Sequence, residues 1–535
     1  MDFMEKLGGF KGILRKKPFK NEPFKFTITP PKDLIVFPKI ESVKDFSFMY
    51  PLLEPFAYAH IMWSNIKGSL LYRIVEPTLT DKEKKTYDRI VESLTEIIDV
   101  ELSSIKGTGK AFEYIENHVK KILEEIEIRV DNTSYNKIMY YIYRNFIGLN
   151  EIEPLMHDPY IEDISCDGLD IPLYVIHKKL GSIETNIIFN NEDKLKNFVI
   201  KLSERCGRYI SYAEPLLDGA LPDGSRVQAS LAQDVTTKGP TFSIRKFTSE
   251  PLSPIDLINL KTASSEIMAY LWFCVEMGVS LMICGGTATG KTTMLNAISL
   301  FIPPEFKIVS IEDTRELQLP HENWIPSVAR IGFGLPGSGG GKYGEVTMFD
   351  LLKASFRQNP DYVIVGEVRG VEASVMFQGM ASGHPSMGTM HAAGVSTVIK
   401  RLQTPPISLS PSLIEMLDIV VTMVHSKEKG KSARRVKSIE EIEAVESTGI
   451  ARTSTVFRWI PSKDVFEPGE GNYTLDKIAR VKGISLKTVN KEIKNRIKII
   501  DYMVKNNITH WRDVSKIVSK YHRNSKEVLK ELKIK

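Results

Sequence analysis

Residues 280–293 read Ser-Leu-Met-Ile-Cys-Gly-Gly-Thr-Ala-Thr-Gly-Lys-Thr-Thr, a short apolar run followed by the pattern G-x-x-x-x-G-K-T. The glycines of this pattern let a loop wrap so that its backbone N–H groups point at phosphate oxygens. Lys291 is expected to contact the β- and γ-phosphates of a nucleotide, and the Thr292 hydroxyl to ligate Mg²⁺. The apolar run is predicted as a strand and residues 292–300 as a helix whose positive end faces the same anion. The sequence therefore predicts a nucleotide-binding loop, formed by Gly285, Gly286, Thr287, Ala288, Thr289, Gly290, Lys291, Thr292 and Thr293.

A second glycine-rich stretch, residues 332–345, also contains a Gly-Lys step. Tyr343 stands where the metal-ligating Ser or Thr would be, and Pro336 replaces the first glycine of the pattern. No apolar strand precedes this stretch. It is predicted to be a flexible loop near the nucleotide, not a second phosphate cradle.

The composition indicates a globular protein of several domains. A chain of 535 residues is expected to form three or four domains, and its 42% hydrophobic and 26% charged residues are ordinary for a soluble protein. The four cysteines form no C-x-x-C pair, which argues against a disulfide framework or a zinc ribbon and fits a reducing cytoplasm. The N-terminal residues lack the apolar segment of a signal peptide. Residues 267–284, the most apolar stretch, are interrupted by Glu276 and Gly278 and are predicted as a buried helix and strand, not a membrane span.

Charge is distributed unevenly along the chain. The net charge is +5, yet residues 471–535 contain 17 Lys and Arg against 6 Asp and Glu, so the remainder is mildly acidic. Residues 1–40 are rich in Lys, Phe and Pro and are predicted to be a poorly ordered leader. This leader is either a solvated tail or a segment that docks to a partner or a membrane surface.

The pattern of apolar residues divides the chain into five segments. Residues 1–80 are assigned to the leader and an N-terminal extension, and residues 81–148 to a helical segment, so the extension before the α+β domain is expected to be helical. Strand-like runs separated by Asp-Gly and Leu-Gly turns predict an α+β domain at 149–250. A linker near Pro251 and Pro254 then precedes a nucleotide-binding core at 251–450. Residues 451–535 are predicted to be a basic helical region.

Strand and helix patterns alternate through the core. Strands are predicted at 280–284, 307–311, 362–366, 387–391 and 419–425. Helices are predicted at 292–300, 348–358, 371–382, 395–403 and 411–418. Such alternation is typical of an α/β fold with a mostly parallel, doubly wound sheet.

Two predicted strands end in carboxylates that suit nucleotide chemistry. Glu367 follows the apolar run 362–365, and an acid at a strand end near a nucleotide can hold the Mg²⁺ shell or orient the attacking water. Gly366 stands where many ATPases place a second acid. Glu312 or Asp313, which follow another apolar run, could supply that missing carboxylate. Solvent exposure of a strand-end Glu without function is the alternative for Glu367.

Two histidines and two arginines complete the candidate site. His384 and His391 lie on either side of a predicted strand and are candidates for sensing phosphate, since their spacing does not suit joint ligation of one metal. Arg226 and Arg245 precede the core. Arginine can stabilise charge on a transferring phosphoryl group from another domain or subunit, but ordinary surface ion pairs explain the two residues equally well.

Taken together, Gly285–Thr292, Ile311–Glu316, Gly366–Arg369 and Gly383–His391 resemble four sequence boxes of the secretion ATPases. These are the Walker A, Asp, Walker B and His boxes of the type II/type IV secretion and type IV pilus ATPase superfamily. The resemblance covers about residues 150–445. It implies a PAS-like N-terminal domain, a RecA-like core and a ring of six subunits.

The resemblance also implies roles for the candidate residues. Glu367 would activate water, Glu312 would assist at Mg²⁺, and both would join Thr292 around the metal ion. His384 and His391 would couple phosphate to movement. Arg226 and Arg245 look like the arginines of the family's N-terminal domain that close over the γ-phosphate. The implied substrate and cofactor are ATP and Mg²⁺, and the implied mechanism is a cycle of domain closure and reopening around the ring.

Finer features are most similar to the archaellum motor ATPase. The chain lacks the tetracysteine motif of bacterial type II members, and residues 348–361, 383–391 and 408–417 look like the archaellum enzyme. This implies a motor at the cytoplasmic face of the membrane that drives assembly and rotation of the filament. Its implied partners are a polytopic membrane platform protein, a RecA-like accessory ATPase and a scaffold ring. The archaeal pilus-assembly and type II secretion ATPases share most of these residues and remain the alternative.

Nucleic-acid binding is an alternative function from a different class. Ala479, Gly483 and Val489 have the spacing of a helix-turn-helix, and Lys491, Lys494 and Arg496 follow, so DNA handling is a weaker alternative. A basic helical pair is more often a solvated or partner-facing surface. A nucleotide-gated scaffold without hydrolysis is a third reading, which no sequence feature favours.

Overall fold

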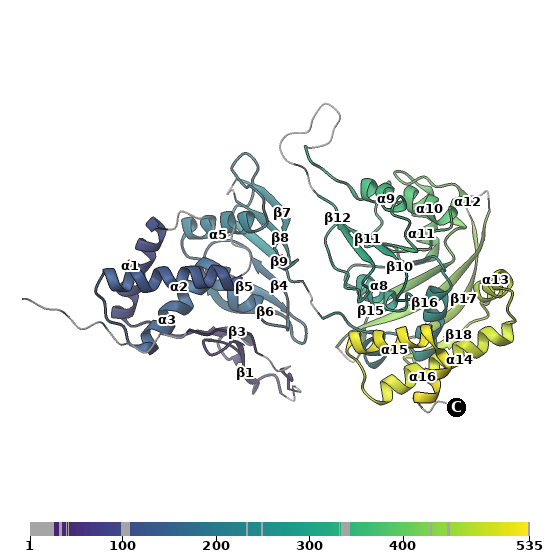
Figure 1. Ribbon diagram of the computed structural model, residues 1–535, viewed down its shortest axis with the longest axis horizontal. Helices are drawn as coiled ribbons and strands as arrows, with labels where there is room; N and C mark the ends of the chain where they lie inside the picture. The colour runs from purple at the N-terminus through teal and green to yellow at the C-terminus, as the bar shows by residue number, and fades with distance from the viewer. Residues whose placement is uncertain are drawn as a thin grey trace, which may run out of the picture. The chain divides into compact units, whose positions relative to one another are not determined.

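The computed structural model describes residues 26–31, 35–38, 40, 42–97, 108–231, 234–247, 250–330, 332, 343–428, 431–446 and 450–532. The chain divides into two compact units, Met1–Lys246 and Phe247–Lys535, close to the predicted boundary between residues 250 and 251. Each unit contains a nine-stranded sheet (Figure 1). No helix in the described ranges is long and apolar enough to cross a membrane.

The first unit is an α+β structure. Its sheet has the order β1-β2-β3-β6-β5-β4-β9-β8-β7, and its neighbouring strands are antiparallel except β3 and β6. The strands are β1 (Ser47–Leu53), β2 (Ala57–Ser64), β3 (Ser69–Val75), β4 (Ile161–Cys166), β5 (Pro172–His177), β6 (Gly181–Ile188), β7 (Leu216–Ala220), β8 (Arg226–Ser230) and β9 (Thr241–Arg245). The helices are α1 (Asp81–Ile97), α2 (Thr108–Glu125), α3 (Asn132–Ile142), α4 (Glu153–Met156) and α5 (Glu192–Arg205).

Strands β1 to β3 correct the expectation of a helical N-terminal extension. Ala57, Ala59 and Ile61 of β2 are fully buried and alternate with half-buried residues, which is the two-residue period of a strand. This alternation is visible in the sequence, but the prediction assigned these residues to the N-terminal extension and placed no strand there. Of the predicted leader, residues 1–25, 32–34 and 39 lie outside the described residues.

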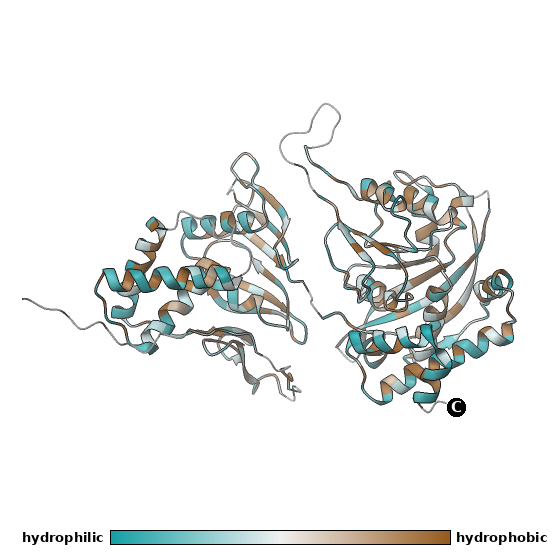
Figure 2. Cartoon of the chain, in the orientation of Figure 1, coloured by the Kyte–Doolittle hydropathy of each residue, from teal (hydrophilic) through white to brown (hydrophobic). Residues whose placement is uncertain are grey.

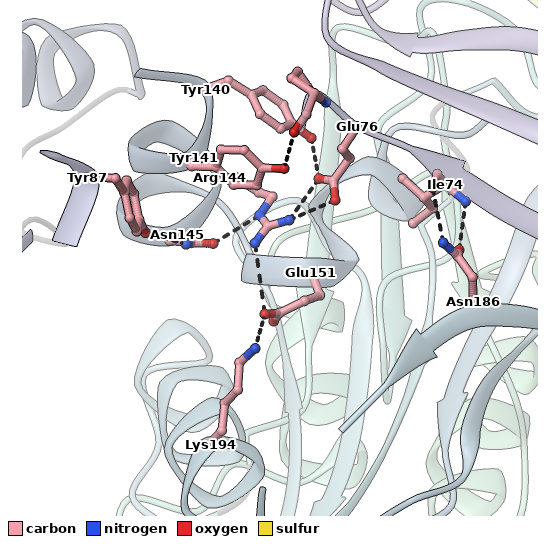
Figure 3. A network of polar contacts seen from close by, with 11 residues as sticks. Ile74, Glu76, Tyr87, Tyr140, Tyr141, Arg144, Asn145, Glu151, Asn186 and Lys194 are labelled. Carbon is pink, nitrogen blue, oxygen red and sulfur yellow. Dashed lines mark hydrogen bonds and ion pairs between the residues drawn. The ribbon is translucent and has the colours of Figure 1, made fainter. Parts of the chain in front are cut away.

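Side chains attach this three-stranded piece to the remainder of the first unit. The parallel β3–β6 pairing covers two residue pairs, and the Asn186 side chain continues it by bonding the N–H and C=O of Ile74 at 2.8 and 3.1 Å. Beyond β3, Glu76 accepts two hydrogen bonds from buried Arg144, each of 2.8 Å, and one of 2.5 Å from the Tyr140 hydroxyl (Figure 3). A buried, bidentate arginine fixes geometry as well as adding energy, so this network holds the helices against the strands.

The second unit has a mostly parallel sheet with an antiparallel extension. Its order is β12-β11-β13-β14-β10-β15-β16-β17-β18, with parallel pairing from β12 to β15 and antiparallel pairing from β15 to β18. The strands are β10 (Leu281–Gly285), β11 (Ile308–Glu312), β12 (Trp324–Val328), β13 (Tyr362–Val365), β14 (Ser386–Met390), β15 (Ile419–Glu428), β16 (Lys431–Val445), β17 (Ala451–Ile460) and β18 (Val465–Pro468).

Helices flank this sheet on both faces. They are α6 (Pro254–Asn259), α7 (Ser265–Glu276), α8 (Lys291–Ser299), α9 (Met348–Phe356), α10 (Glu372–Ala381), α11 (Val395–Gln403), α12 (Pro411–Ile414), α13 (Tyr473–Lys482), α14 (Leu486–Lys505), α15 (Trp511–Arg523) and α16 (Ser525–Glu531). Leu281 and Ile283 of β10 pack in one core with α7 and α8, whereas Met282 and Cys284 pack in another with α10. The doubly wound α/β prediction is confirmed, since the central strands are buried on both faces. Figure 2 shows hydrophobic residues along these strands and hydrophilic residues on the outer sides of the C-terminal helices.

Most predicted core elements begin and end within about two residues of the observed ones. Helix α12 is shorter than the predicted 411–418, and β15 extends past residue 425 to Glu428. The prediction that 451–535 is helical is wrong at its start, because β17 and β18 continue the sheet to Pro468 and the helices begin at Tyr473. Alternation of buried and exposed residues is weak in β17, whose side chains are mostly half-buried, so the strand gave little sequence signal.

A candidate nucleotide-binding site

Strand β10 leads directly into a tight loop and then into α8. All five residues of β10 are buried, and the helix begins at Lys291. Gly290 adopts φ +88° and ψ 27°, in the left-handed region that glycine tolerates best. Ala288 also has a positive φ, +58°, which is uncommon for a residue with a side chain. The predicted strand, loop and helix are therefore confirmed.

The loop between β10 and α8 is a compact turn. A Cβ atom at Gly285 would lie 2.6 Å from Thr289 Oγ1 and 2.7 Å from the Met423 carbonyl oxygen, so a side chain does not fit there. Thr289 Oγ1 donates to the Gly286 carbonyl at 2.9 Å and is buried. Residues 286–288 are exposed, and Thr292 and Thr293 are half-buried in the first turn of α8. A loop that is exposed at residues 286–288 and leads into a helix N-terminus fits the phosphates of a nucleotide.

Lys291 connects the loop to the neighbouring strand. Its ammonium group donates to the Gly286 carbonyl at 2.9 Å and lies 3.4 Å from His391 Nε2. Burial lowers the pKa of Lys291, and the charge of Glu367 partly opposes this effect. The positive charge of Lys291 is therefore close to His391, which follows β14, and to Glu367, which follows β13.

Glu367 lies at the carboxyl end of β13, as the sequence predicts. Its Oε2 accepts a 2.6 Å hydrogen bond from Arg369 Nη2, and its Oε1 lies 3.2 Å from His391 Nε2. Burial raises the pKa of Glu367, but Arg369 and His391 more than offset it, so the pKa is lowered and the carboxylate is ionised at neutral pH. Lys291 and Glu367 thus both approach His391 Nε2, and the three side chains form a polar cluster beside the loop. Arg369 had no role in the sequence interpretation, although it stands two residues after Glu367.

Glu312 ends β11 and is almost completely buried. Its side chain is in a residue only 2% exposed, and its Oε1 accepts from the N–H groups of Glu316 and Leu317 at 2.8 and 3.0 Å. Its Oε2 is buried without a hydrogen-bond partner among the described residues. Burial raises the pKa of Glu312 to about 7. Asp313, the alternative acid, is exposed.

The two histidines are separated. His391 follows β14 on the side of Lys291, whereas His384 precedes β14 and therefore lies toward its other end. His384 Nδ1 is 3.1 Å from the Pro360 carbonyl oxygen, and its ring lies 5.2 Å from that of Phe356. Within this unit the structure does not bring His384 together with the loop.

Arg226 and Arg245 lie in the first unit on paired strands. They are directly opposite each other on β8 and β9. Arg226 forms an ion pair with Asp218 and Arg245 one with Asp163, both at 3.1 Å. Their side chains are 38% and 69% exposed, which fits both the surface ion-pair reading and a role at a phosphate. Residues 333–342 of the second glycine-rich stretch lie outside the described residues.

Comparison with known proteins identifies the family. The family described as "Type II/IV secretion system protein" matches residues 152–456, which is more than half of the chain. The chain belongs to this family. The match spans β4 to β17 and so includes parts of both units.

Individual proteins are also similar to this chain. The uncharacterized protein MJ0900 of Methanocaldococcus jannaschii is 37% identical over 515 residues, or 92% of each chain. The type IV secretion system protein PtlH of Bordetella pertussis is 32% identical over 45% of this chain and 79% of its own. The solved structure of the Yersinia pseudotuberculosis ATPase DotB is 15% identical, covers 69% of this chain and 92% of its own, and superposes with a TM-score of 0.40.

Proposed function

We propose that this protein is a Mg²⁺-dependent ATPase that acts as a hexameric motor at the cytoplasmic face of the membrane and powers assembly and rotation of the archaellum. The observation that carries the ATPase activity is the cluster of Lys291, His391 and Glu367, in which His391 Nε2 lies 3.4 Å from Lys291 and 3.2 Å from Glu367, beside the phosphate-binding loop of residues 285–292 (the P-loop). It combines a phosphate-binding cation with an ionised carboxylate placed to accept a proton from water.

Lys291, Glu367 and His391 have distinct tasks in the proposed reaction. The loop amides and Lys291 bind the phosphates, and Glu367 orients water and takes its proton. His391, between the two, is close enough to respond when Lys291 moves from the Gly286 carbonyl to a phosphate. Mg²⁺ would be held by Thr292 together with Glu312 or Glu367, and it would neutralise charge on the phosphates. The unpartnered Oε2 of Glu312 fits such a ligand, directly or through water.

The first unit supplies the remaining parts of the proposed cycle. Its α+β sheet would be the PAS-like N-terminal domain, and Arg226 and Arg245 would close over the γ-phosphate when ATP is bound. An arginine that reaches a transferring phosphoryl group stabilises charge that develops in the transition state. Release of phosphate would let the two arginines return to Asp218 and Asp163. His384 would act in coupling this closure to movement of the ring.

Archaellum motility and pilus assembly or type II secretion share this ATPase chemistry. The test is a chromosomal Lys291→Ala substitution in the source organism, scored for surface filaments by electron microscopy and for swimming. Loss of archaella with other pili intact would support the motor function. Unchanged archaella with a missing pilus or secreted product would move the protein to the pilus-assembly and secretion branch and leave the ATPase proposal standing.

DNA handling loses one of the residues that suggested it. Arg496 is 2% exposed and bonded to Glu276 and Glu492, so it does not face an external partner. Lys491 and Lys494 remain exposed on α14. A steep decline of DNA affinity with rising salt would revive this alternative.

A further inference from the structure

The β15–β16 hairpin continues past the point where β10 ends. The last residue pair between β10 and β15 joins Gly285 to Met423. Beyond Met423, β15 pairs with β16 through Val424–Arg435 and His425–Arg434, up to Glu428–Lys431. Because β10 turns into the P-loop at Gly285, the part of the hairpin beyond Met423 flanks the loop.

Arg434, on the β16 strand of this hairpin, contacts the P-loop. Its Nε–H donates to the Ala288 carbonyl at 3.1 Å. A Cβ atom at Gly290 would lie 3.2 Å from Arg434 Cδ, so the arginine side chain runs close along the last turn of the loop. A guanidinium group has four further N–H donors beyond the one on Nε. Arg434 therefore places an exposed cation at the rim of the predicted phosphate site.

The order of the strands decides which part of a nucleotide this cation faces. In the sequence β13-β14-β10-β15-β16, Glu367 and His391 belong to the β13–β14 side of the P-loop strand, and Arg434 belongs to the β15–β16 side. Under the proposed function, the γ-phosphate reacts on the side of Glu367. The opposite rim then faces the part of the nucleotide that is not cleaved. Guanidinium groups bind phosphate oxygens and hydroxyls through several donors at once.

We infer that Arg434 binds the α-phosphate and ribose of the nucleotide from the side of the loop opposite Glu367. This inference rests on the proposed nucleotide binding at the P-loop. Arg434 would exchange its contact with the Ala288 carbonyl for one with the nucleotide. It is a determinant of nucleotide affinity shared by ATP and ADP, not a group that acts on the reacting phosphate.

The test measures dissociation constants for ATP and ADP with fluorescent nucleotides in the full chain, comparing Arg434→Ala and Arg434→Lys with the wild type. A lost hydrogen bond to a charged group corresponds to a roughly tenfold weaker Kd, and we expect this factor for both nucleotides in Arg434→Ala. Arg434→Lys should recover part of the affinity. Hydrolysis at sub-saturating ATP should fall by the same factor, while kcat at saturation changes much less.

Arg452→Ala is the matched control. Arg452 lies on the neighbouring β17, is 72% exposed and pairs with Glu443 at 2.9 Å, so its removal should leave both dissociation constants unchanged. Thermal melting of each variant would establish that the fold persists, and Arg434→Gln replaces Arg434→Ala if the latter unfolds. ATP and ADP affinities within twofold of the wild type, or a loss confined to kcat, would overturn the inference. A wild-type protein that binds neither nucleotide would instead overturn the proposed function.

Discussion

The side chain of Glu312 occupies the space beside Gly366. A Cβ atom at Gly366 would lie 3.0 Å from Glu312 Cγ, closer than nearly all ordinary contacts. The two residues end neighbouring parallel strands, and the Gly366 N–H donates to the Ile311 carbonyl at 2.9 Å. The glycine that replaces a second acid after β13 thus leaves room for a carboxylate from β11. Of the two acids that could supply the missing carboxylate, Glu312 is the one next to this position.

Substitution of Gly366 by Ala should therefore destabilise the protein by displacing Glu312. Overpacking of this kind costs about 1–3 kcal/mol in the free energy of unfolding. Glu312→Ala removes the crowded Cγ atom, so Gly366→Ala should cost less in that background. A double-mutant cycle of denaturant unfolding measures the coupling.

Gly394→Ala is the control for that cycle. Gly394 has extended backbone, φ 167°, and a Cβ atom there would meet nothing within 4 Å. Its substitution should change stability by less than about 0.5 kcal/mol. Strictly additive effects of Gly366→Ala and Glu312→Ala would show that the two side chains do not compete for space.

The buried Glu312 carboxyl should make stability depend on pH. Burial raises its pKa to about 7 in the folded chain, above the ordinary value of 4.5, so the folded state holds a proton that the unfolded state loses between those values. Stability without nucleotide should consequently fall as the pH rises from about 4.5 to 7, by on the order of 3 kcal/mol from this group. Glu312→Gln cannot ionise, so its stability relative to the wild type should improve with pH across this window. Thermal unfolding at pH 5 and pH 8 would measure this, and an equal difference at both pH values would contradict the burial effect.

Lys291 and Glu367 should have separable roles. Lys291→Ala removes the cation expected on the phosphates, so both ATP binding and turnover should be lost. Glu367→Gln keeps the shape of the site but removes the proton acceptor, so turnover should fall by about 10²–10⁴-fold while ATP still binds. Nucleotide titration and steady-state hydrolysis on the same preparations distinguish the two. Equal loss of binding in both variants would refute this division.

Arg226 and Arg245 should affect turnover more than binding. Two like charges directly opposite on paired strands disfavour the sheet, and Asp218 and Asp163 offset this repulsion. If the pair closes over the γ-phosphate, Arg226→Ala and Arg245→Ala should each lower kcat by roughly 10³-fold, the effect of losing an arginine finger. Arg73→Ala, an exposed arginine on β3 of the same sheet, is the control. Unchanged kcat in both variants would leave the arginines as surface ion pairs.

Arg496 should be essential for stability. Its guanidinium donates to Glu276 at 2.5 Å and Glu492 at 2.9 Å and lies 5.4 and 4.9 Å from the rings of Trp272 and Tyr521. This network joins α14 and α15 to α7. Arg496→Ala removes a buried guanidinium that holds two half-buried carboxylates, and its loss should cost up to about 3–5 kcal/mol in unfolding free energy, the range for breaking a buried ion pair. Lys494→Ala, two residues away and exposed, should be nearly neutral in the same denaturation experiment.

Local sequence patterns determined the framework of the second unit. The apolar run before Gly285, the glycines and Lys291 predicted a strand, a phosphate-binding loop and a helix, because backbone conformation and two-residue or 3.6-residue periodicity depend on neighbouring residues. The same reasoning placed Glu367 at a strand end. It missed β1 to β3, whose alternation was assigned to an extension, and β17, where burial is nearly uniform along the strand. It also missed β16 and β12, and β12 lies just before the second glycine-rich stretch, where no strand was expected.

Only the tertiary structure decided which distant side chains meet. The order of strands places β11 beside β13, which brings Glu312 to Gly366, and places β15 and β16 beyond the end of β10, which brings Arg434 to the P-loop. The basic character of the C-terminal region was evident from composition, but burial of Arg496 depends on packing of α14 against α7. These long-range contacts depend on the crossover connections between strands and on helix packing. Both are determined by burial of the whole core, which no short stretch of sequence encodes.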